Sequence, residues 1–371
     1  MIMESDKMKV VISAGGTGGH IYPALAIINK IKEEEPNSEF LYIGTTDRME
    51  KDLIPSLGYR YEGLEVTGFK RKLSLDNIKT VTNFLGAIKK SKKIISDFNP
   101  DVVIGCGGYV TAPVIYAAKK LGKKTFIHEQ NSVVGLANKF LSRYTDKVGV
   151  SFESTIKDFP DGKAILTGNP CSEKAIGIKK TTKKELEIDE NKKLVLMVMG
   201  SLGSRSVNDK IFDFVDNFRN KDYSVIIVTG NSYYEKVKNK RVPDNVKILP
   251  FIYEMPKVMK ITDLMVTRAG ASTMSEITAL EVPSILIPSP YVTNNHQYKN
   301  AMDLVNNNAG IILEEKDLEG KALIDLIDNT LNDKNKLKEI KSNLKKMGIK
   351  DSSTRIYNVL KELILDDRKF Y

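Results

Sequence analysis

The chain has 371 residues, 41% of them hydrophobic and 28% charged, which is typical of a folded enzyme of two domains and too apolar for a disordered chain. Two cysteines cannot form a disulfide framework and, with only three histidines, do not suggest a structural zinc site. No apolar run reaches the roughly 18–20 residues of a membrane-spanning helix, and residues 1–9 do not have the pattern of a secretory signal, so we expect a cytoplasmic protein. The net charge of +10 is concentrated between Arg60 and Lys124, where 13 Lys or Arg stand against 5 Asp or Glu, and it indicates an anionic partner: nucleic acid, a phosphorylated substrate or a membrane surface.

Short apolar segments alternate with helical patterns along the chain. This alternation predicts parallel strands buried between helices, and therefore an α/β fold. The predicted strands are 9–13, 39–43, 102–104, 125–128, 147–150, 164–166, 194–199, 224–228, 246–249, 264–267 and 284–287. The order of strand, glycine loop and helix occurs at residues 9–28 and again at 194–214, so we expect a doubly wound arrangement with two Rossmann-like halves.

The turn-rich residues 167–170 are the expected boundary between the halves. We expect an N-terminal domain over residues 1–167, a C-terminal domain over 168–350 and a final helix over 351–371. Packing of that helix back on the first domain is one possibility that the sequence leaves open. Its apolar residues share one helix face: Ile356, Val359, Leu360, Leu363 and Ile364.

Residues 15–20 (Gly-Gly-Thr-Gly-Gly-His) follow the first predicted strand and precede a helix. Glycines let a ligand approach the backbone closely, and a helix N-terminus favours anionic groups. The pattern matches neither Gly-x-Gly-x-x-Gly nor a Walker A loop, and Gly44 stands after Ile43 where an NAD site has an acid. The segment predicts an anion site, with a plain strand–helix turn as the alternative.

Two further loops follow predicted strands. Residues 105–109 (Gly-Cys-Gly-Gly-Tyr) fit a turn and a ligand loop equally well, although such loops converge at one edge of a parallel sheet. Residues 268–276 predict a loop, an N-cap at Ser272 and a helix with Glu276 in its first turn. Glu276 then either complements the helix dipole or accepts hydrogen bonds from a ribose diol.

The chain offers little for metal binding. His20, His128 and His296 lie at predicted junctions or loops, without carboxylates at ligand spacing. No Asp-x-Asp occurs in the sequence. We therefore expect no metal site.

Together these motifs resemble the MurG family, the UDP-N-acetylglucosamine transferases that glycosylate lipid I in peptidoglycan synthesis. The matching segments occur in family order from residue 10 to about 301: 15–20, 44–45, 107–109, 128–131 (His-Glu-Gln-Asn), 168–170, 200–203 (Gly-Ser-Leu-Gly), 268–276, 296–297 and 300–301. The resemblance implies a GT-B fold, two Rossmann-like domains facing a cleft, with the acceptor on the N-terminal domain and UDP-GlcNAc mainly on the C-terminal one. It implies inverting, metal-independent transfer of GlcNAc to the C4 hydroxyl of MurNAc in lipid I, giving lipid II for cell wall biogenesis, cell shape and cell division.

The resemblance also implies roles for single residues. His20 is the expected general base, Glu276 the ribose ligand, and Gly18 and Gly19 backbone donors to a diphosphate. Sugar contacts are expected from Asn131 and Gln297, phosphate or uracil-side contacts from Ser201 and Ser275, and a uracil contact from Ile252. The other donor- or substrate-binding residues implied are Thr17, Ala271, Ser272, Thr273 and Met274.

One departure concerns the diphosphate. The family often has an arginine directly after Gly-Asn-Pro, whereas Cys171 and Ser172 follow Pro170 here. Arg205 is the candidate substitute. No cofactor is expected, and the implied partners are UDP-GlcNAc, lipid I and an anionic membrane surface.

Because the acceptor's polyprenyl tail stays in the bilayer, we expect a peripheral protein on the cytoplasmic face of the cell membrane. Residues 69–93 are basic and amphipathic, as a membrane-docking segment requires. Lysines close the segment, and its apolar positions either enter the bilayer or face the domain core. These apolar positions are Leu75, Ile78, Phe84, Leu85 and Ile88.

Two other functions remain open at this point. One is an isomerase on the same fold, similar to UDP-GlcNAc 2-epimerase. The other is a basic nucleic-acid-binding protein, which the lack of interleaved aromatic residues and of a recognisable module disfavours.

Overall fold

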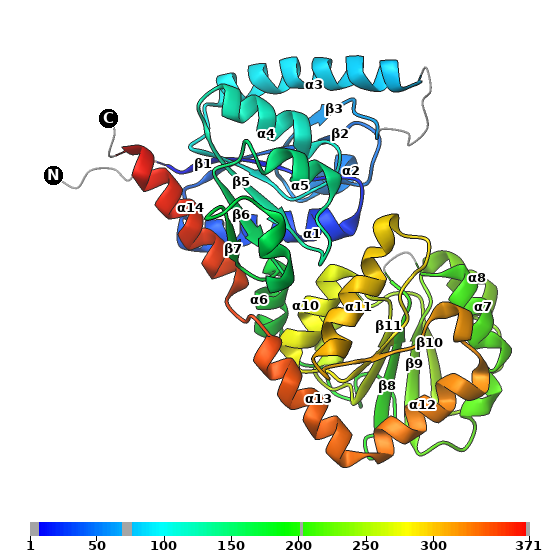
Figure 1. Ribbon diagram of the computed structural model, residues 1–371. Coiled ribbons are helices and arrows are strands. Elements are labelled where there is room, and N and C mark those ends of the chain that lie inside the picture. The colour runs from blue at the N-terminus through cyan, green and yellow to red at the C-terminus, as the bar shows by residue number, and fades with distance from the viewer. Residues whose placement is uncertain (1–6, 69–75, 201–202, 369–371) are drawn as a thin grey trace. The chain divides into compact units, whose positions relative to one another are not determined.

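The computed structural model describes residues 7–68, 76–200 and 203–368, which form two compact α/β units (Figure 1). Unit 1 comprises Met1–Cys171 and Asp351–Tyr371, and unit 2 comprises Ser172–Lys350. The chain passes from unit 1 to unit 2 within α6 (Pro170–Gly177) and returns before the last helix.

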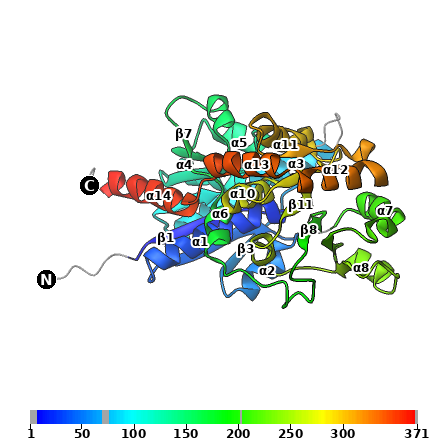
Figure 2. The same ribbon diagram turned by 90° about the horizontal axis from the view of Figure 1, so that it is seen from below.

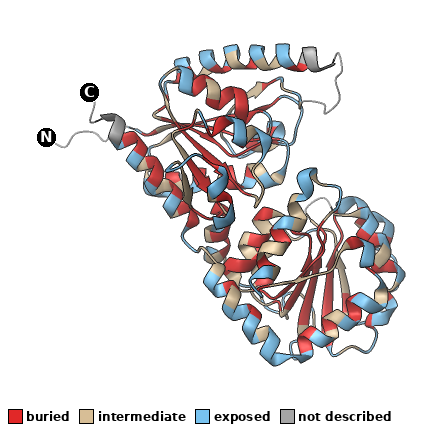
Figure 3. Ribbon diagram, viewed as in Figure 1, coloured by how far each residue is buried: buried red, intermediate tan, exposed pale blue. Residues whose placement is uncertain are grey.

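Unit 1 contains a seven-stranded parallel sheet in the order β3-β2-β1-β4-β5-β6-β7. Its strands are β1 (Lys9–Ser13), β2 (Glu39–Thr45), β3 (Arg60–Leu64), β4 (Val102–Gly105), β5 (Lys124–Glu129), β6 (Lys147–Val150) and β7 (Ala164–Leu166). Figure 3 shows most of these strands buried, as expected where helices cover both faces of a parallel sheet.

The helices of unit 1 form two layers. They are α1 (Gly18–Glu34), α2 (Glu50–Ser56), α3 (Asp76–Phe98), α4 (Thr111–Lys120), α5 (Leu136–Leu141) and α14 (Ser352–Arg368), with a 3₁₀ helix at Glu153–Asp158. In Figure 1, α3, α4 and α5 lie on one face of the sheet and α1 and α14 on the other. Ile95 and Ile115 belong to the core on the first face, and Ile27 and Leu360 to the core on the second.

The last helix, α14, packs alongside α1 (Figure 2). All five apolar residues that the sequence placed on one face of this helix are buried, from Ile356 to Ile364. Glu35 accepts hydrogen bonds from the Tyr357 hydroxyl at 2.9 Å and from the Lys361 ammonium. These two bonds hold the pKa of the Glu35 carboxyl below its usual value.

Unit 2 contains a six-stranded parallel sheet in the order β10-β9-β8-β11-β12-β13. Its strands are β8 (Lys193–Val198), β9 (Tyr223–Val228), β10 (Val246–Leu249), β11 (Leu264–Thr267), β12 (Ser284–Leu286) and β13 (Ile311–Ile312). Its helices are α7 (Arg205–Asp213), α8 (Asn231–Val237), α9 (Met255–Met259), α10 (Ala271–Leu280), α11 (His296–Asn306), α12 (Gly320–Asn332) and α13 (Lys334–Met347), with 3₁₀ helices at Val215–Phe218, Thr293–Asn295 and Glu315–Asp317.

The two units repeat one topology. In each, the first strand lies inside the sheet, with the next two strands on one side and the later strands on the other. A carboxylate holds the start of that first strand in both cases: Asp101 accepts from the Lys9 amide at 2.7 Å, and Asp263 from the Leu194 amide at 2.8 Å. The predicted α/β fold with two parallel, Rossmann-like sheets is confirmed, and all eleven predicted strands are present.

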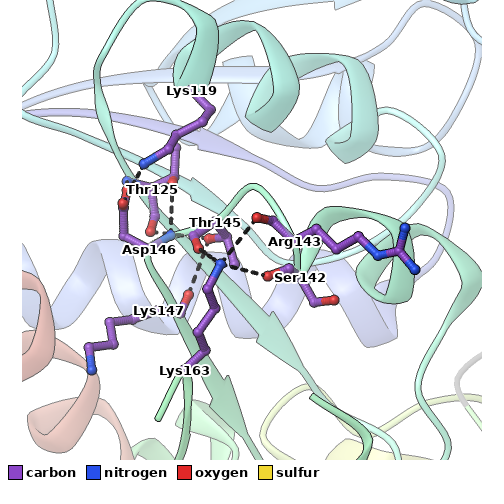
Figure 4. Close-up of polar contacts among 8 residues, drawn as sticks. All are labelled: Lys119, Thr125, Ser142, Arg143, Thr145, Asp146, Lys147 and Lys163. Carbon is purple, nitrogen blue, oxygen red and sulfur yellow. Dashed lines mark hydrogen bonds and ion pairs between the residues drawn. The ribbon is translucent and has the colours of Figure 1, made fainter. Parts of the chain in front are cut away.

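A polar cluster fixes the turn that ends α5 (Figure 4). The Lys163 ammonium donates to the carbonyls of Ser142, Arg143 and Thr145 at 3.0, 3.2 and 2.8 Å. Asp146 accepts from the Thr125 amide and hydroxyl at 2.9 and 2.7 Å. Because the last carbonyls of a helix lack intrahelical partners, such side-chain donors stabilise a helix as short as α5.

Candidate active site

The strand order of each sheet determines which loops lie together at the position where ligands bind. In an open α/β sheet, ligands bind beyond the carboxyl ends of the strands where the strand order reverses. In unit 1 that point lies between β1 and β4, which lead into the glycine loops at residues 14–17 and 106–110. In unit 2 it lies between β8 and β11, which lead into the loops at 199–204 and 268–270.

The two glycine loops of unit 1 pack directly against each other. The Gly15 amide donates to the Gly107 carbonyl at 3.2 Å. A side chain on Gly108, which has φ +89°, would place its Cβ 2.5 Å from the Gly15 oxygen. Residue 108 must therefore be glycine for the two loops to approach this closely. The predicted convergence of the two loops is confirmed.

His20 lies in the first turn of α1 and rests on both loops. Its Nδ1 is 3.0 Å from the Gly15 carbonyl oxygen, and because a carbonyl only accepts, the proton of this contact lies on Nδ1. A Cβ on Gly107 would lie 2.5 Å from the His20 ring. The Thr17 hydroxyl also lies 3.4 Å from Nδ1. The contact with the Gly15 carbonyl favours the neutral tautomer that has its proton on Nδ1 and its lone pair on Nε2.

The segment 128–131 holds the neighbouring strand end in place. Gln130 Nε2 donates to the Cys106 carbonyl at 2.6 Å, and the Glu129 carboxylate accepts from the Asn131 and Gly135 amides at 3.0 and 2.9 Å. His128 is fully buried and donates through Nε2 to the Gly168 carbonyl at 2.9 Å. Burial lowers its pKa to about 4, so it is a neutral structural residue.

In unit 2, Arg268 acts on the loop after β8. Its guanidinium is buried and donates to Ser204 Oγ at 2.7 Å and to Glu315 at 2.6 Å. Gly203 has φ +72°, and a Cβ there would lie 2.2 Å from the Thr229 carbonyl oxygen. Ser201, an expected phosphate or uracil-side contact, lies outside the described residues.

The start of α10 differs from the sequence prediction. Gly270 is the N-cap, so the predicted N-cap at Ser272 is wrong, and Glu276 lies in the second turn rather than the first. The extended Gly270 backbone starts the helix two residues earlier than the serine signal suggests. The Ser272 hydroxyl does not cap the helix; it is buried and has no hydrogen-bond partner among the described residues.

Glu276 is a partly buried carboxyl without a hydrogen bond to other described residues. Loss of water around it raises its pKa to about 7, and the nearby Lys174 ammonium opposes this shift only weakly. Such a group accepts hydrogen bonds most strongly above neutral pH.

The remaining expected site residues differ in burial and in their hydrogen bonds. In α10, Ala271 and Met274 are buried, Thr273 is half-buried, and the Ser275 hydroxyl donates to the Ser272 carbonyl at 2.7 Å. The Gln297 side chain accepts from the Ser289 amide at 2.9 Å. Thr17, Gly19 and Arg205 are exposed, and Gly18, Asn131 and Ile252 are half-buried.

Sequence reasoning missed two buried carboxylates. Glu50 bonds to the first glycine loop, and Glu315 pairs with Arg268. Neither stands in a local pattern, because their partners lie 34 and 47 residues away in sequence.

Among the described residues, no three His, Cys, Asp or Glu side chains lie together in a way that could hold a metal ion. The same residues include no helix both long and apolar enough to cross a membrane.

Comparison with known proteins shows which family the chain resembles. The profile of the glycosyltransferase family 28 N-terminal domain matches residues 10–150, and that of the family's C-terminal domain matches residues 194–356. The UDP-N-acetylglucosamine–N-acetylmuramyl-(pentapeptide) pyrophosphoryl-undecaprenol N-acetylglucosamine transferase 1 of Bacillus cereus is 49% identical over 364 residues, covering 96% of this chain and all of that protein.

Solved structures give a consistent result. The crystal structure of Acinetobacter baumannii MurG has a TM-score of 0.78 at 26% identity, covering 96% of this chain and 99% of that one. UDP-GlcNAc 2-epimerase from Neisseria meningitidis, bound to UDP-GlcNAc, has a TM-score of 0.66 at 16% identity, covering 96% and 100%. At 16% identity, the similarity to the epimerase shows only that this chain has the same fold.

Proposed function

The chain belongs to the MurG family within glycosyltransferase family 28, and on that premise we propose which of its residues carry out the reaction. It transfers N-acetylglucosamine from UDP-N-acetylglucosamine to lipid I, and the product is lipid II of peptidoglycan synthesis. The roles that follow rest chiefly on one observation, the fixed position of His20 on the two glycine loops of unit 1.

His20 is the general base in this proposal. In the tautomer that the Gly15 carbonyl favours, the proton is on Nδ1 and Nε2 accepts the proton of the attacking hydroxyl. The amides at the start of α1, including those of Gly18 and Gly19, favour the acceptor's diphosphate because they lie at a helix N-terminus. Unit 1 therefore binds lipid I.

Unit 2 binds the donor. The N-terminus of α10 favours the diphosphate of UDP, and the Ser272 hydroxyl, which bonds to none of the described residues, is a further donor for it. Arg205 is exposed at the first residue of α7, after the glycine loop, and supplies positive charge there. Glu276 accepts hydrogen bonds from the ribose diol, and Ile252 contacts the uracil.

The reaction is a single displacement that inverts the anomeric carbon. One base and a stabilised leaving group are sufficient for such a step. Helix amides and Arg205 stabilise the UDP that leaves, so the protein needs no metal ion to bind the diphosphate.

The helical layer α3–α5 of unit 1 docks on the membrane in this proposal. Of the expected docking segment, residues 69–75 lie outside the described residues, Ile78 lies where side chains are not described, and Phe84 and Ile88 pack against the core and do not enter a bilayer. Leu85 is exposed, and α5 adds exposed Leu136 and Phe140. Exposed basic residues of the same layer are Lys89, Lys90, Lys92, Lys93, Lys119, Lys120, Lys139 and Arg143.

This combination suits an anionic bilayer, because apolar groups enter the interface while ammonium groups lie among the headgroups. Each basic residue near an anionic surface contributes about 1 kcal/mol, so several give reversible attachment. The layer thereby brings unit 1 to the lipid-linked acceptor at the cytoplasmic face of the cell membrane.

One assay distinguishes GlcNAc transfer from the alternative function, isomerisation of UDP-GlcNAc. The purified chain is incubated with UDP-GlcNAc, with and without a short-chain lipid I analogue, and the products are identified by mass spectrometry and NMR. We expect UDP and a β-1,4-linked disaccharide only when the acceptor is present. Formation of UDP-N-acetylmannosamine without acceptor, and no disaccharide with it, would overturn the proposal.

A further inference from the structure

Glu50 is a fully buried carboxylate beneath the first glycine loop. It begins α2, and its Oε2 accepts from the Gly16 amide at 3.2 Å. Its Oε1 accepts from the Thr45 amide at 3.1 Å and from the Thr45 hydroxyl at 2.7 Å. Within the part of the chain that the structure describes, no cationic side chain forms an ion pair with it.

Two glycines make room for this carboxylate. A Cβ on Gly15 would lie 2.5 Å from Glu50 Oε1, and a Cβ on Gly44 would lie 2.7 Å from Glu50 Cγ. Glycine at these two positions therefore allows the side chain to reach the carboxyl ends of β1 and β2 together.

Burying a carboxylate without a counter-ion is costly unless hydrogen bonds replace its lost water. Here three donors do so, one from the first glycine loop and two from Thr45 at the end of β2. The bond to Gly16 also affects the backbone of the glycine loop. Gly16 has φ +89° and is the point where the chain leaves β1 for α1. Fixing its amide fixes the turn that carries the Gly15 carbonyl, which in turn holds the His20 ring.

The same bond selects the donors that face a ligand. The Gly16 amide is occupied by Glu50, so an anion on this loop must use the amides of Thr17, Gly18 and Gly19 at the helix start.

We propose that Glu50 is a positioning residue of the transfer reaction: by binding the Gly16 amide it sets both the orientation of His20 and the set of amides open to the acceptor's diphosphate. This inference rests on the proposed role of His20 as the base.

The test is Glu50→Leu, assayed for transfer to the short-chain lipid I analogue. Leucine has no acceptor atom, so the Gly16 N–H loses its hydrogen bond. We expect kcat to fall at least tenfold, while the KM for UDP-GlcNAc, which binds unit 2 in the proposed function, changes less than twofold. Glu50→Gln can keep its amide oxygen on the Gly16 N–H and direct its amide nitrogen to the Thr45 hydroxyl, which also accepts, so it should retain more activity than Glu50→Leu.

Two control variants distinguish a loss of activity through mispositioned active-site groups from a loss through general destabilisation. Asp101→Ala removes a carboxylate that holds a backbone amide at the opposite end of β1, and at a comparable fall in Tm it should leave kcat within about twofold of wild type. Thr45→Val removes only the hydroxyl donor to Glu50 and leaves the Gly16 bond, so its kcat should also stay within about twofold.

The inference fails if Glu50→Leu keeps kcat within threefold of wild type, or if Asp101→Ala loses as much activity at the same Tm. If Glu50→Leu does not fold, Glu50→Asp replaces it, because the shorter carboxylate cannot reach both Gly16 and Thr45, and the same criteria apply. His20→Ala measured in parallel distinguishes failure of the proposed base from failure of the proposed positioning residue. An active His20→Ala refutes the proposed base, whereas an inactive His20→Ala with an active Glu50→Leu refutes only the role of Glu50.

Discussion

Replacing Glu276 by glutamine should stabilise unit 2 and weaken its binding of UDP. The carboxyl has a pKa of about 7 in the folded chain, against 4.5 when exposed to water. Below pH 4.5 the folded and unfolded states are both protonated. Between pH 4.5 and 7 only the folded state keeps the proton, so its stability falls as the pH rises, and above pH 7 the cost is complete.

The size of this cost follows from the shift. A pKa raised from 4.5 to about 7 corresponds to at most about 3 kcal/mol. Because the side chain is only partly buried, water screens part of it, and about 1–2 kcal/mol is the expected cost at pH 8. Glutamine does not titrate, so Glu276→Gln should gain this amount at pH 8 and little at pH 5.

Scanning calorimetry measures the gain. For a domain of about 150–250 residues, 1–2 kcal/mol raises Tm by about 2–8 °C. The transition of unit 2 is identified in the wild type as the one that UDP moves upward. An equal gain at pH 5 and pH 8, or a loss of stability at pH 8, would refute the reasoning.

Donor binding should change in the opposite direction. If Glu276 accepts from the ribose diol as proposed, losing these bonds costs about 1–3 kcal/mol, so UDP affinity should fall about 5- to 150-fold. Wild-type affinity should rise between pH 6 and pH 8 as the carboxyl ionises, while that of the variant stays flat. Calorimetric titration with UDP and 2′-deoxy-UDP checks this, and an unchanged UDP affinity would leave Glu276 as an ordinary helix residue.

Two further outcomes are expected. Activity should survive exhaustive EDTA treatment, since in the proposed mechanism helix amides and Arg205 bind the diphosphate, and a loss that Mg²⁺ restores would contradict this. Changing Lys89, Lys90, Lys92 and Lys93 to glutamine should weaken sedimentation with anionic vesicles, most at low salt, and slow the turnover of membrane-embedded lipid I but not of a soluble analogue. Equal vesicle binding by variant and wild type would place the docking surface elsewhere.

The fold was predictable because buried parallel strands are local apolar segments. Two strands, β3 and β13, were not predicted because they lack such an apolar segment. The edge strand β3 contains Arg60, Glu62 and Gly63 and is mostly half-buried, so no apolar run marks it. The strand β13 has only two residues, Ile311 and Ile312, too few for a pattern.

The site was predictable only where one segment carries the chemistry. The glycine loops and His20 stand in one continuous motif, and sheet topology then brings the loops together. Glu50 and Glu315 have no such local signal, because long-range packing alone decides that they are buried. The same holds for Phe84 and Ile88, whose helical spacing suits a membrane face and a core equally well.

The central claim is that His20, held by the two glycine loops of unit 1, is the base of the transfer. The most direct test is the single-turnover rate of GlcNAc transfer to the short-chain lipid I analogue by His20→Ala, with binding of UDP-GlcNAc measured alongside. If His20 is the base, we expect a rate about 10²–10⁴ times lower than wild type, with donor affinity unchanged. A rate within a few-fold of wild type would contradict it.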